Sequence, residues 1–296
     1  MDQLVNHLLA LHYVQPMSVR RLQPLLQEDA TLDILSYIAP SKLAQTLKMN
    51  SKQARQILEK YRQLLSFDMV MFYEQQNIVV VPFFSELYPS ALLEVYDPPA
   101  VIYCKGKMEI LQKNKKLAIV GSRTATNYSQ KSIDVIVPEL IAHDVVIVSG
   151  LAKGVDSMAH FSAIKEAGRT IGVLGNGFNH TYPKENANLQ HEMEQNQLVI
   201  TEYPPYMSPR KWNFPMRNRI ISGISAAILV TEAAEKSGTM STVDYGLNHG
   251  RNIFTIPGDI FSPLSKGPNA LILEGATPIW NGQQIIEETK IFSGAK

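Results

Sequence analysis

Cysteine is nearly absent from this chain of 296 residues, which contains only Cys104. One cysteine excludes an internal disulfide and any metal site built from several thiolates. Long apolar runs are also missing, since stretches such as residues 225–230 (SAAILV) are far shorter than the roughly 20 residues of a membrane-spanning helix. The N-terminus lacks the basic start and long apolar segment of a signal peptide. We therefore expect a cytoplasmic protein with no membrane partner.

Several motifs of enzyme chemistry are missing as well. The chain has no Walker-type phosphate loop, and residues 121–126 (GSRTAT) and 175–180 (GNGFNH) lack glycines that the dinucleotide fingerprint requires. No serine lies in a Gly-x-Ser-x-Gly elbow. His160, His180 and His191 show no pair at the spacing that places two metal ligands on one helical face. We expect no metal and no cofactor, and we interpret Asp156 as a helix cap or loop brace.

The sequence changes character twice. Residues 1–66 carry apolar residues at helical spacing, which predicts a small all-helical domain. Residues 67–111 consist of short extended runs and proline pairs, which predict a connector packed on the main domain. Residues 112–296 alternate short β-branched runs with helical stretches, a pattern typical of a parallel sheet covered by helices.

The last region therefore predicts an α/β fold with a doubly wound, Rossmann-like, mainly parallel sheet. The predicted strands are residues 117–121, 145–150, 170–175, 198–203, 226–232 and 252–257. The predicted helices are residues 128–143, 156–168, 185–196, 217–225 and 238–250. Such a sheet binds its ligands beyond the carboxyl ends of its strands, so the loops that follow the strands are the candidate site.

Those loops are rich in glycine, serine and basic residues. They span residues 121–126, 150–157, 175–185, 203–219 and 232–239. Glycine lets backbone N–H groups approach an anion, and the following helix N-terminus adds partial positive charge. One such loop is a weak signal, because glycine after a strand is common for turn geometry alone. The combination favours a surface that binds phosphate groups.

One loop also combines cations with aromatic rings. Residues 210–219 contain Arg210, Lys211, Trp212 and Phe214 without one carboxylate, although the formal net charge of the whole chain is only +1. A groove for single-stranded nucleic acid of any sequence needs cations for the phosphates and aromatic faces for the bases. We expect Trp212 itself to be a buried packing anchor, which is the more common fate of a lone tryptophan.

Together these motifs resemble the DNA-processing protein A family, also called DprA or Smf. The segments that carry the resemblance are residues 120–123 (VGSR), 149–160 (SGLAKGVDSMAH), 174–183 (LGNGFNHTYP), 213–225 (NFPMRNRIISGIS), 231–242 (TEAAEKSGTMST) and 256–276. They occur in the order of the family and cover roughly residues 80–280, and the N-terminal region fits the small sterile-alpha-motif-like (SAM-like) domain of many members. Many members end in a winged-helix domain, which we do not expect here.

The resemblance implies a non-enzymatic role in natural transformation. Members of the family bind and protect single-stranded DNA that enters the cell and load the RecA recombinase onto it. They pair through the C-terminal part of the sheet domain, so the resemblance implies a homodimer. The apolar residues expected at that interface are Leu271, Leu273 and Ile279.

The resemblance also implies a set of DNA contacts. Arg123 corresponds to the arginine that grips a phosphate in the family, Lys184 and Lys211 match basic positions, and Phe214 matches an aromatic position that inserts against a base. Arg219 has an alternative structural role as the partner of a loop carboxylate, Glu202 or Glu232. The remaining expected contacts are Gly121, Ser122, Gly150, Lys153, Gly154, Arg217, Asn218, Arg219, Gly238 and Thr239.

Two alternatives remain open at this point. The loops are also similar to those of lysine-decarboxylase-like nucleotide phosphoribohydrolases, which cleave glycosidic bonds with a glutamate three residues after a glycine-threonine pair. Here Thr242 stands where that glutamate belongs, so the chain lacks the carboxylate of that chemistry. A sensor that binds a small nucleotide without turnover is the other alternative.

Overall fold

The computed structural model describes residues 2–293, which form two compact units. The smaller unit comprises the chain up to Tyr88 together with Tyr96–Cys104 and Glu202–Pro204. The larger unit comprises Pro89–Val95, Lys105–Thr201 and the chain from Pro205 onward. The division predicted at residues 66 and 111 stays a proposal. Among the described residues, no helix is both long enough and apolar enough to span a membrane.

The smaller unit begins with helices that are capped by side chains. Ser18, Asn50 and Asp68 each accept a hydrogen bond from a backbone N–H of the first turn that follows, which is the usual way to begin a helix. Its elements are α1 (Asp2–Val14), α2 (Val19–Glu28), η1 (Asp33–Ser36), α3 (Pro40–Thr46), α4 (Ser51–Leu64), α5 (Met69–Glu74), β1 (Val79–Pro82) and most of β2 (Val101–Gly106). Strands β1 and β2 pair antiparallel. The predicted N-terminal helical region is confirmed.

The larger unit alternates strands and helices along the chain. Its strands are β3 (Lys116–Val120), β4 (Val146–Ser149), β5 (Thr170–Val173), β6 (Leu198–Thr201), β7 (Ala227–Val230), β8 (Asn252–Thr255) and β9 (Thr277–Pro278). Its helices are α6 (Ser90–Leu93), η2 (Met108–Ile110), α7 (Asn127–Ala142), α8 (Val155–Lys165), η3 (Lys184–Asn186), α9 (Ala187–Asn196), α10 (Asn213–Ile224), α11 (Gly238–Asn248), η4 (Pro263–Ser265), α12 (Lys266–Leu273), α13 (Gly282–Glu288) and α14 (Lys290–Ser293). Each strand and helix predicted from the sequence is present.

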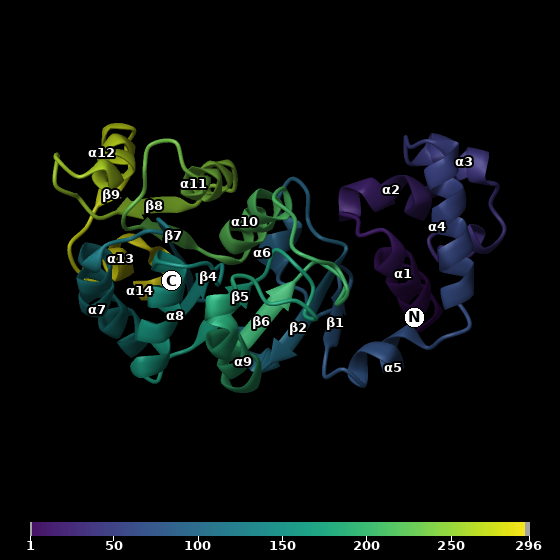
Figure 1. Ribbon diagram of the computed structural model, residues 1–296, viewed down its shortest axis with the longest axis horizontal. Coiled ribbons are helices and arrows are strands. Elements are labelled where there is room, and N and C mark those ends of the chain that lie inside the picture. The colour runs from purple at the N-terminus through teal and green to yellow at the C-terminus, as the bar shows by residue number, and fades with distance from the viewer. Residues whose placement is uncertain (1, 294–296) are drawn as a thin grey trace. The chain divides into compact units, whose positions relative to one another are not determined.

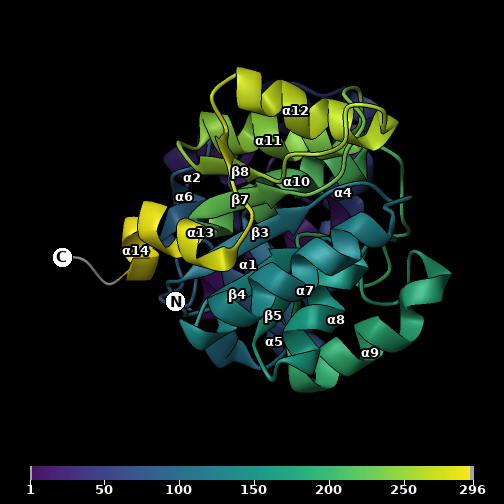
Figure 2. The same cartoon turned by 90° about the vertical axis from the view of Figure 1, so that its left-hand side faces the viewer.

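The seven strands of the larger unit form a parallel sheet in the order β6-β5-β4-β3-β7-β8-β9. The chain winds outward from β3 to β6, then crosses back to β7 on the other side of β3. Helices α7, α8 and α9 cover one face of the sheet, and α10 and α11 cover the other (Figure 2). Helices α11 and α12 lie beside β8 (Figure 1). This is the predicted doubly wound fold, and its topological switch point lies between β3 and β7.

The core of the larger unit corrects one expectation. Buried aliphatic residues of β3, α7, α8 and β7 pack together with Ile279 and helix α13. Ile279 is completely buried there, which contradicts the prediction that it contacts a second copy of the chain. Leu271 is buried too, at 6% exposure, whereas Leu273 is 90% exposed. Of the predicted interface residues, Leu273 alone is available at the surface of the described chain.

Candidate nucleic-acid interface

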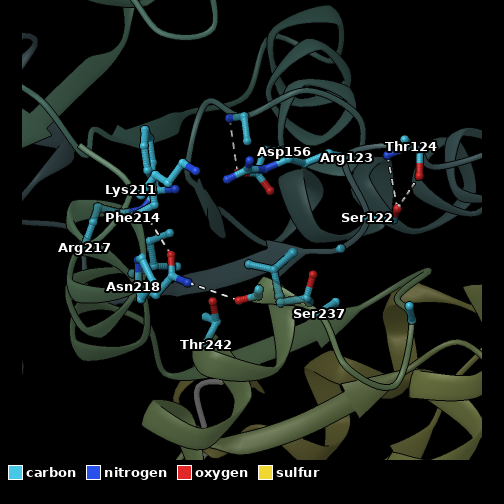
Figure 3. Close-up of a pocket in the computed structure, with 18 of the residues that line it drawn as sticks. Ser122, Arg123, Thr124, Asp156, Lys211, Phe214, Arg217, Asn218, Ser237 and Thr242 are labelled. Atoms are coloured by element: carbon cyan, nitrogen blue, oxygen red, sulfur yellow. Dashed lines mark hydrogen bonds between the residues drawn. The ribbon is translucent and has the colours of Figure 1, made fainter. Parts of the chain in front are cut away.

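A pocket of about 600 Å³ opens at the switch point of the sheet. The loops that follow β3, β4, β5, β6 and β7 all contribute to its lining, as expected for the carboxyl end of a doubly wound sheet. Lys211, Phe214 and Asn218 lie on one side of the pocket, with Ser122 and Thr124 opposite and Ser237 and Thr242 below (Figure 3). Residues from five loops, far apart in sequence, therefore meet at one place.

The loop after β3 is fixed by the loop after β7. Ser122 donates its backbone N–H to the carbonyl of Glu232 at 2.6 Å, and the Ser122 hydroxyl accepts the N–H of Thr124 at 3.1 Å. The Glu232 carboxylate in turn accepts hydrogen bonds from Thr126 and Ser129. These bonds hold the backbone at Arg123, whose exposed side chain lines the pocket. The backbone that carries the Arg123 cation is therefore held by hydrogen bonds to the loop after β7.

Glycines allow the loops to approach one another closely. Gly154 has φ +73°, and a Cβ there would collide with the carbonyl oxygen of Ser122. A Cβ at Gly150 would collide with the guanidinium of Arg217. Gly150 and Gly154 were predicted to bring backbone close to a phosphate, but in the structure they make room for neighbouring protein groups. Their contact with DNA stays a prediction.

Asp156 braces the loop after β4, as the sequence predicts. Its Oδ2 accepts the N–H groups of Gly150 at 3.1 Å and Ala152 at 3.2 Å. Burial raises the pKa of the Asp156 carboxyl above its ordinary value, and the charge of Arg217 opposes that shift. With this oxygen committed to two backbone groups, Asp156 shapes the pocket wall.

Arg217 and Arg219 occupy a different environment from the one expected of phosphate contacts. Arg217 is 4% exposed and donates to the carbonyl oxygen of Gly150 at 2.6 Å and to that of Val173. It thereby ties α10 to the loop after β4 and to the last residue of β5, although it still lines the pocket. Arg219 is only 3% exposed. Their burial favours structural roles for both arginines, and their DNA contacts stay predictions.

Aromatic rings form one wall of the pocket. The ring of Phe214 lies 5.1 Å from that of Tyr182 at an angle of 44°, and the Arg123 guanidinium lies 5.7 Å from the Phe214 ring. Gly175 packs beneath this ring, since a Cβ there would come within 2.9 Å of it. Tyr182 was missed by the sequence analysis, although an aromatic residue two positions before Lys184 was a usable signal. A cation and two rings thus meet at the pocket.

Helix α11 presents its N-terminus to the pocket. Ser237, Gly238 and Thr239 line it, and the N-cap Ser237 makes no side-chain hydrogen bond to the first turn. N–H groups at a helix start carry partial positive charge and suit an anion. Asn218 fixes the position of this helix, because its amide donates to the Ser241 hydroxyl at 2.7 Å. The predicted residues Asn218, Gly238 and Thr239 are therefore brought to the same pocket.

The predicted lysines are distributed unevenly around the site. Lys211 is exposed and lines the pocket directly. Lys153 lines a smaller adjoining cavity of about 130 Å³ and forms an ion pair with Glu185 at 2.5 Å. Lys184 is exposed but does not line either cavity. Trp212, expected to be buried, is 64% exposed, so that prediction is wrong.

The pocket offers binding groups but few groups for acid–base chemistry. Among its lining residues, all within the described chain, only Asp156 carries a carboxyl, and that carboxyl braces the loop. Thr242 is buried in the lining, at the position where the phosphoribohydrolases carry a glutamate. Cations, aromatic rings and helix N–H groups suit the binding of phosphates and bases.

Comparison with known proteins agrees with this geometry. The family model of the DNA recombination-mediator protein A matches residues 79–290. The chain belongs to this family. It is 45% identical over 216 residues to the DNA processing protein DprA of Bacillus subtilis, a match that covers 73% of either chain.

Two solved structures of the family are similar to the whole fold or to most of it. The X-ray structure of DprA from Streptococcus pneumoniae superposes with a TM-score of 0.82 at 33% identity, covering 96% of this chain and 98% of that one. The DNA processing protein A of Helicobacter pylori, described with its single-stranded DNA binding mode, gives a TM-score of 0.65 at 32% identity and covers 71% of this chain and 94% of its own. The resemblance inferred from sequence motifs is confirmed.

Proposed function

We propose that the chain binds single-stranded DNA through the pocket at the switch point. The observation that carries the proposal is the placement of the Arg123 guanidinium 5.7 Å from the Phe214 ring, beside Lys211 and the start of α11. A strand of any sequence offers a phosphate and an unstacked base at each nucleotide, and this arrangement suits both. The single-stranded DNA binding described for the Helicobacter pylori relative supports the proposal.

The wider role that we propose is non-enzymatic. The chain protects single strands that enter the cytoplasm during natural transformation and loads the RecA recombinase onto them, acting as a homodimer. The family description as a recombination mediator supports this role, and so does Thr242 at the position of the missing glutamate.

The binding step is tested with fluorescence anisotropy of labelled oligonucleotides, single-stranded and duplex, over a series of salt concentrations. We expect tighter binding of single strands and an affinity that falls as salt rises, because bound cations are released from the phosphates. Equal affinity for duplex and single strand would contradict a pocket that stacks unpaired bases.

The loading step needs a separate measurement. RecA ATP hydrolysis is followed on single strands already covered by a single-strand-binding protein, with and without this chain. We expect the chain to shorten the lag before hydrolysis begins. An unchanged lag, with DNA binding intact, would remove the loading role and leave the binding role in place.

The non-enzymatic assignment has its own test. Purified protein incubated with nucleoside monophosphates is expected to release no free base, since the pocket lining lacks an available carboxylate. Steady release of base would identify a phosphoribohydrolase. Saturable binding of mononucleotides without release would favour a nucleotide sensor.

A further inference from the structure

Trp212 is a large aromatic side chain that the fold leaves in solvent beside the pocket. It is 64% exposed, and the Arg210 guanidinium lies over its ring, 5.6 Å from the centroid. Its sequence neighbour Lys211 lines the pocket, and Phe214 follows two residues later. What distinguishes this exposed indole is the guanidinium over its ring and its position next to a residue that lines the pocket, which together offer an aromatic face and a cation to one ligand.

The exposure does not come from a loose loop. Asn213 is buried, donates its backbone N–H to the Arg210 carbonyl at 2.9 Å and donates its side-chain amide to the Gly175 carbonyl at 3.0 Å. Trp212 itself is the N-cap of α10. Upstream, Pro205 and Met207 accept hydrogen bonds from the N–H groups of Asn179 and Gly177. The indole is therefore held outward by a segment that is anchored at both ends.

The surroundings of Trp212 along the chain are free of acidic residues. No Asp or Glu occurs between Glu202 and Glu232, whereas Arg210 and Lys211 flank the indole directly. Both cations are exposed. A partner that covers this indole therefore meets two cations within the same turn, which favours a ligand that carries an apolar ring and a negative charge together.

We propose that Trp212 and Arg210 form a second base-stacking subsite for single-stranded DNA, outside the pocket and next to it. The indole stacks on a nucleobase, and Arg210 and Lys211 contact the phosphates on either side of that nucleotide. The subsite extends the strand past Phe214. This inference rests on the proposed function, because it requires a strand that already occupies the pocket.

Intrinsic fluorescence tests the contact directly, because the chain contains only two tryptophans, Trp212 and Trp280. Trp280 is 70% exposed in the same unit and serves as the matched control. In a Trp280→Phe variant, saturation with unlabelled oligothymidylate of roughly 16 nucleotides should quench the emission of Trp212. In a Trp212→Phe variant, the emission of Trp280 should stay unchanged. No quenching in the first variant under saturating DNA would overturn the subsite.

Affinity provides a second and independent readout. Trp212→Ala should weaken binding of the long oligothymidylate by about 5- to 150-fold, the range that corresponds to losing one stacked base. A phosphorylated thymidine dinucleotide is short enough to occupy the pocket without reaching Trp212. Trp212→Ala should therefore bind this dinucleotide with the same affinity as the unaltered chain. Trp280→Ala should change neither affinity.

The outcomes separate this inference from the proposed function. If no oligonucleotide binds the unaltered chain, the proposed function fails. If the affinity for long strands falls in Arg123→Ala but is unchanged in Trp212→Ala, the proposed pocket is supported and the subsite is wrong. If Trp212→Ala leaves DNA affinity intact but abolishes stimulation of RecA, the indole contacts a protein, which also contradicts the subsite.

Discussion

The Arg123 guanidinium lies 5.7 Å from the centroid of the Phe214 ring, but the two side chains should contribute to binding in different ways. Arg123→Ala removes the proposed phosphate contact, so the slope of log affinity against log salt should shrink by up to about 0.7, with a similar loss for all sequences. Phe214→Ala removes a stacking face and should cost about 1–3 kcal/mol of binding free energy with the salt slope unchanged.

The control variants for these two substitutions lie on α7 and α8, outside the pocket lining. Lys131→Ala on α7 and Phe161→Ala on α8 remove an exposed cation and an exposed ring away from the pocket, and both should bind as the unaltered chain does. Salt titrations by anisotropy measure all four variants. A lowered salt slope for Phe214→Ala would show that its effect is electrostatic and would contradict the assignment.

His160 should make stability depend on pH. Thr170 donates its hydroxyl proton to the Ile147 carbonyl at 2.8 Å, so its oxygen accepts from Nδ1 of a neutral His160 at 2.6 Å. Burial lowers the pKa of His160 to about 3. As pH falls below about 6.5, His160 becomes protonated in the unfolded chain but stays neutral in the folded chain. The free energy of unfolding therefore decreases.

The variant His160→Asn isolates this effect. Between about pH 7 and pH 5 it should lose about 2 kcal/mol less of its free energy of unfolding than the unaltered chain. Urea titrations at the two pH values measure the difference, and His191→Asn, at an exposed position, is the control. An equal acid loss in the unaltered chain and in His160→Asn would mean that His160 is not the titrating group.

Which side chains meet was harder to predict than which loops meet. The motifs place Arg123, Lys211, Phe214 and Gly238 at one pocket correctly.

The motifs do not show that the Arg217 side chain is buried, because its partners Gly150 and Val173 are distant in sequence. Nor do they tell that Trp212 turns outward, because that depends on the buried amide of Asn213. Burial of a single side chain is decided by tertiary neighbours that a linear pattern does not contain.

At the scale of elements, the junction between β3 and α8 depends on one glycine. Gly154→Ala must adopt φ +73° and also push against the Ser122 carbonyl. Gly250 is the control for the positive φ alone, since its φ is +67° and a Cβ there meets nothing within 4 Å, whereas Gly154 also has ψ −127°, outside the left-handed helical region. Gly250→Ala should cost about 1–2 kcal/mol of stability. Gly154→Ala should cost about 1–3 kcal/mol more and should weaken DNA binding, as measured by urea unfolding and anisotropy. Equal costs would show that the close approach is not strained.

The six predicted strands, β3 to β8, were predictable because each is a short run of aliphatic and β-branched residues bounded by glycine or polar residues. The sequence predicts no element after residue 257, where the structure has α12, β9, α13 and α14, and it places the start of α10 too late. The sequence predicts this helix from residue 217, yet it begins at Asn213, and Pro215 sits in its first turn. Proline is tolerated there because N–H groups of the first turn have no partner within the helix. Phe214 therefore lies on a helix rather than on a loop, which fixes its ring more firmly.

At the scale of the whole molecule, Leu273 is the one predicted interface residue that is exposed, so it is the position at which to test the proposed homodimer. This residue is 90% exposed on α12, and Leu247 on α11 is exposed as well. Leu273→Asp should halve the mass measured by light scattering, because a charge at an apolar interface is costly to bury. Val135→Asp, at an exposed site on α7, should leave the mass unchanged. A monomeric mass for the unaltered chain would dismiss the dimer altogether.

The cross-bracing of the pocket loops by Arg217, Glu232 and Asp156 has a calorimetric consequence. A site whose loops are already tied together orders little protein chain when a strand binds, and its backbone should move by less than about 1 Å. The heat capacity change on binding should then be small, in proportion to the base surface that stacks, without the large term of coupled folding. The binding enthalpy should accordingly vary little and linearly with temperature. We therefore expect the bound strand, rather than the protein backbone, to change conformation on binding.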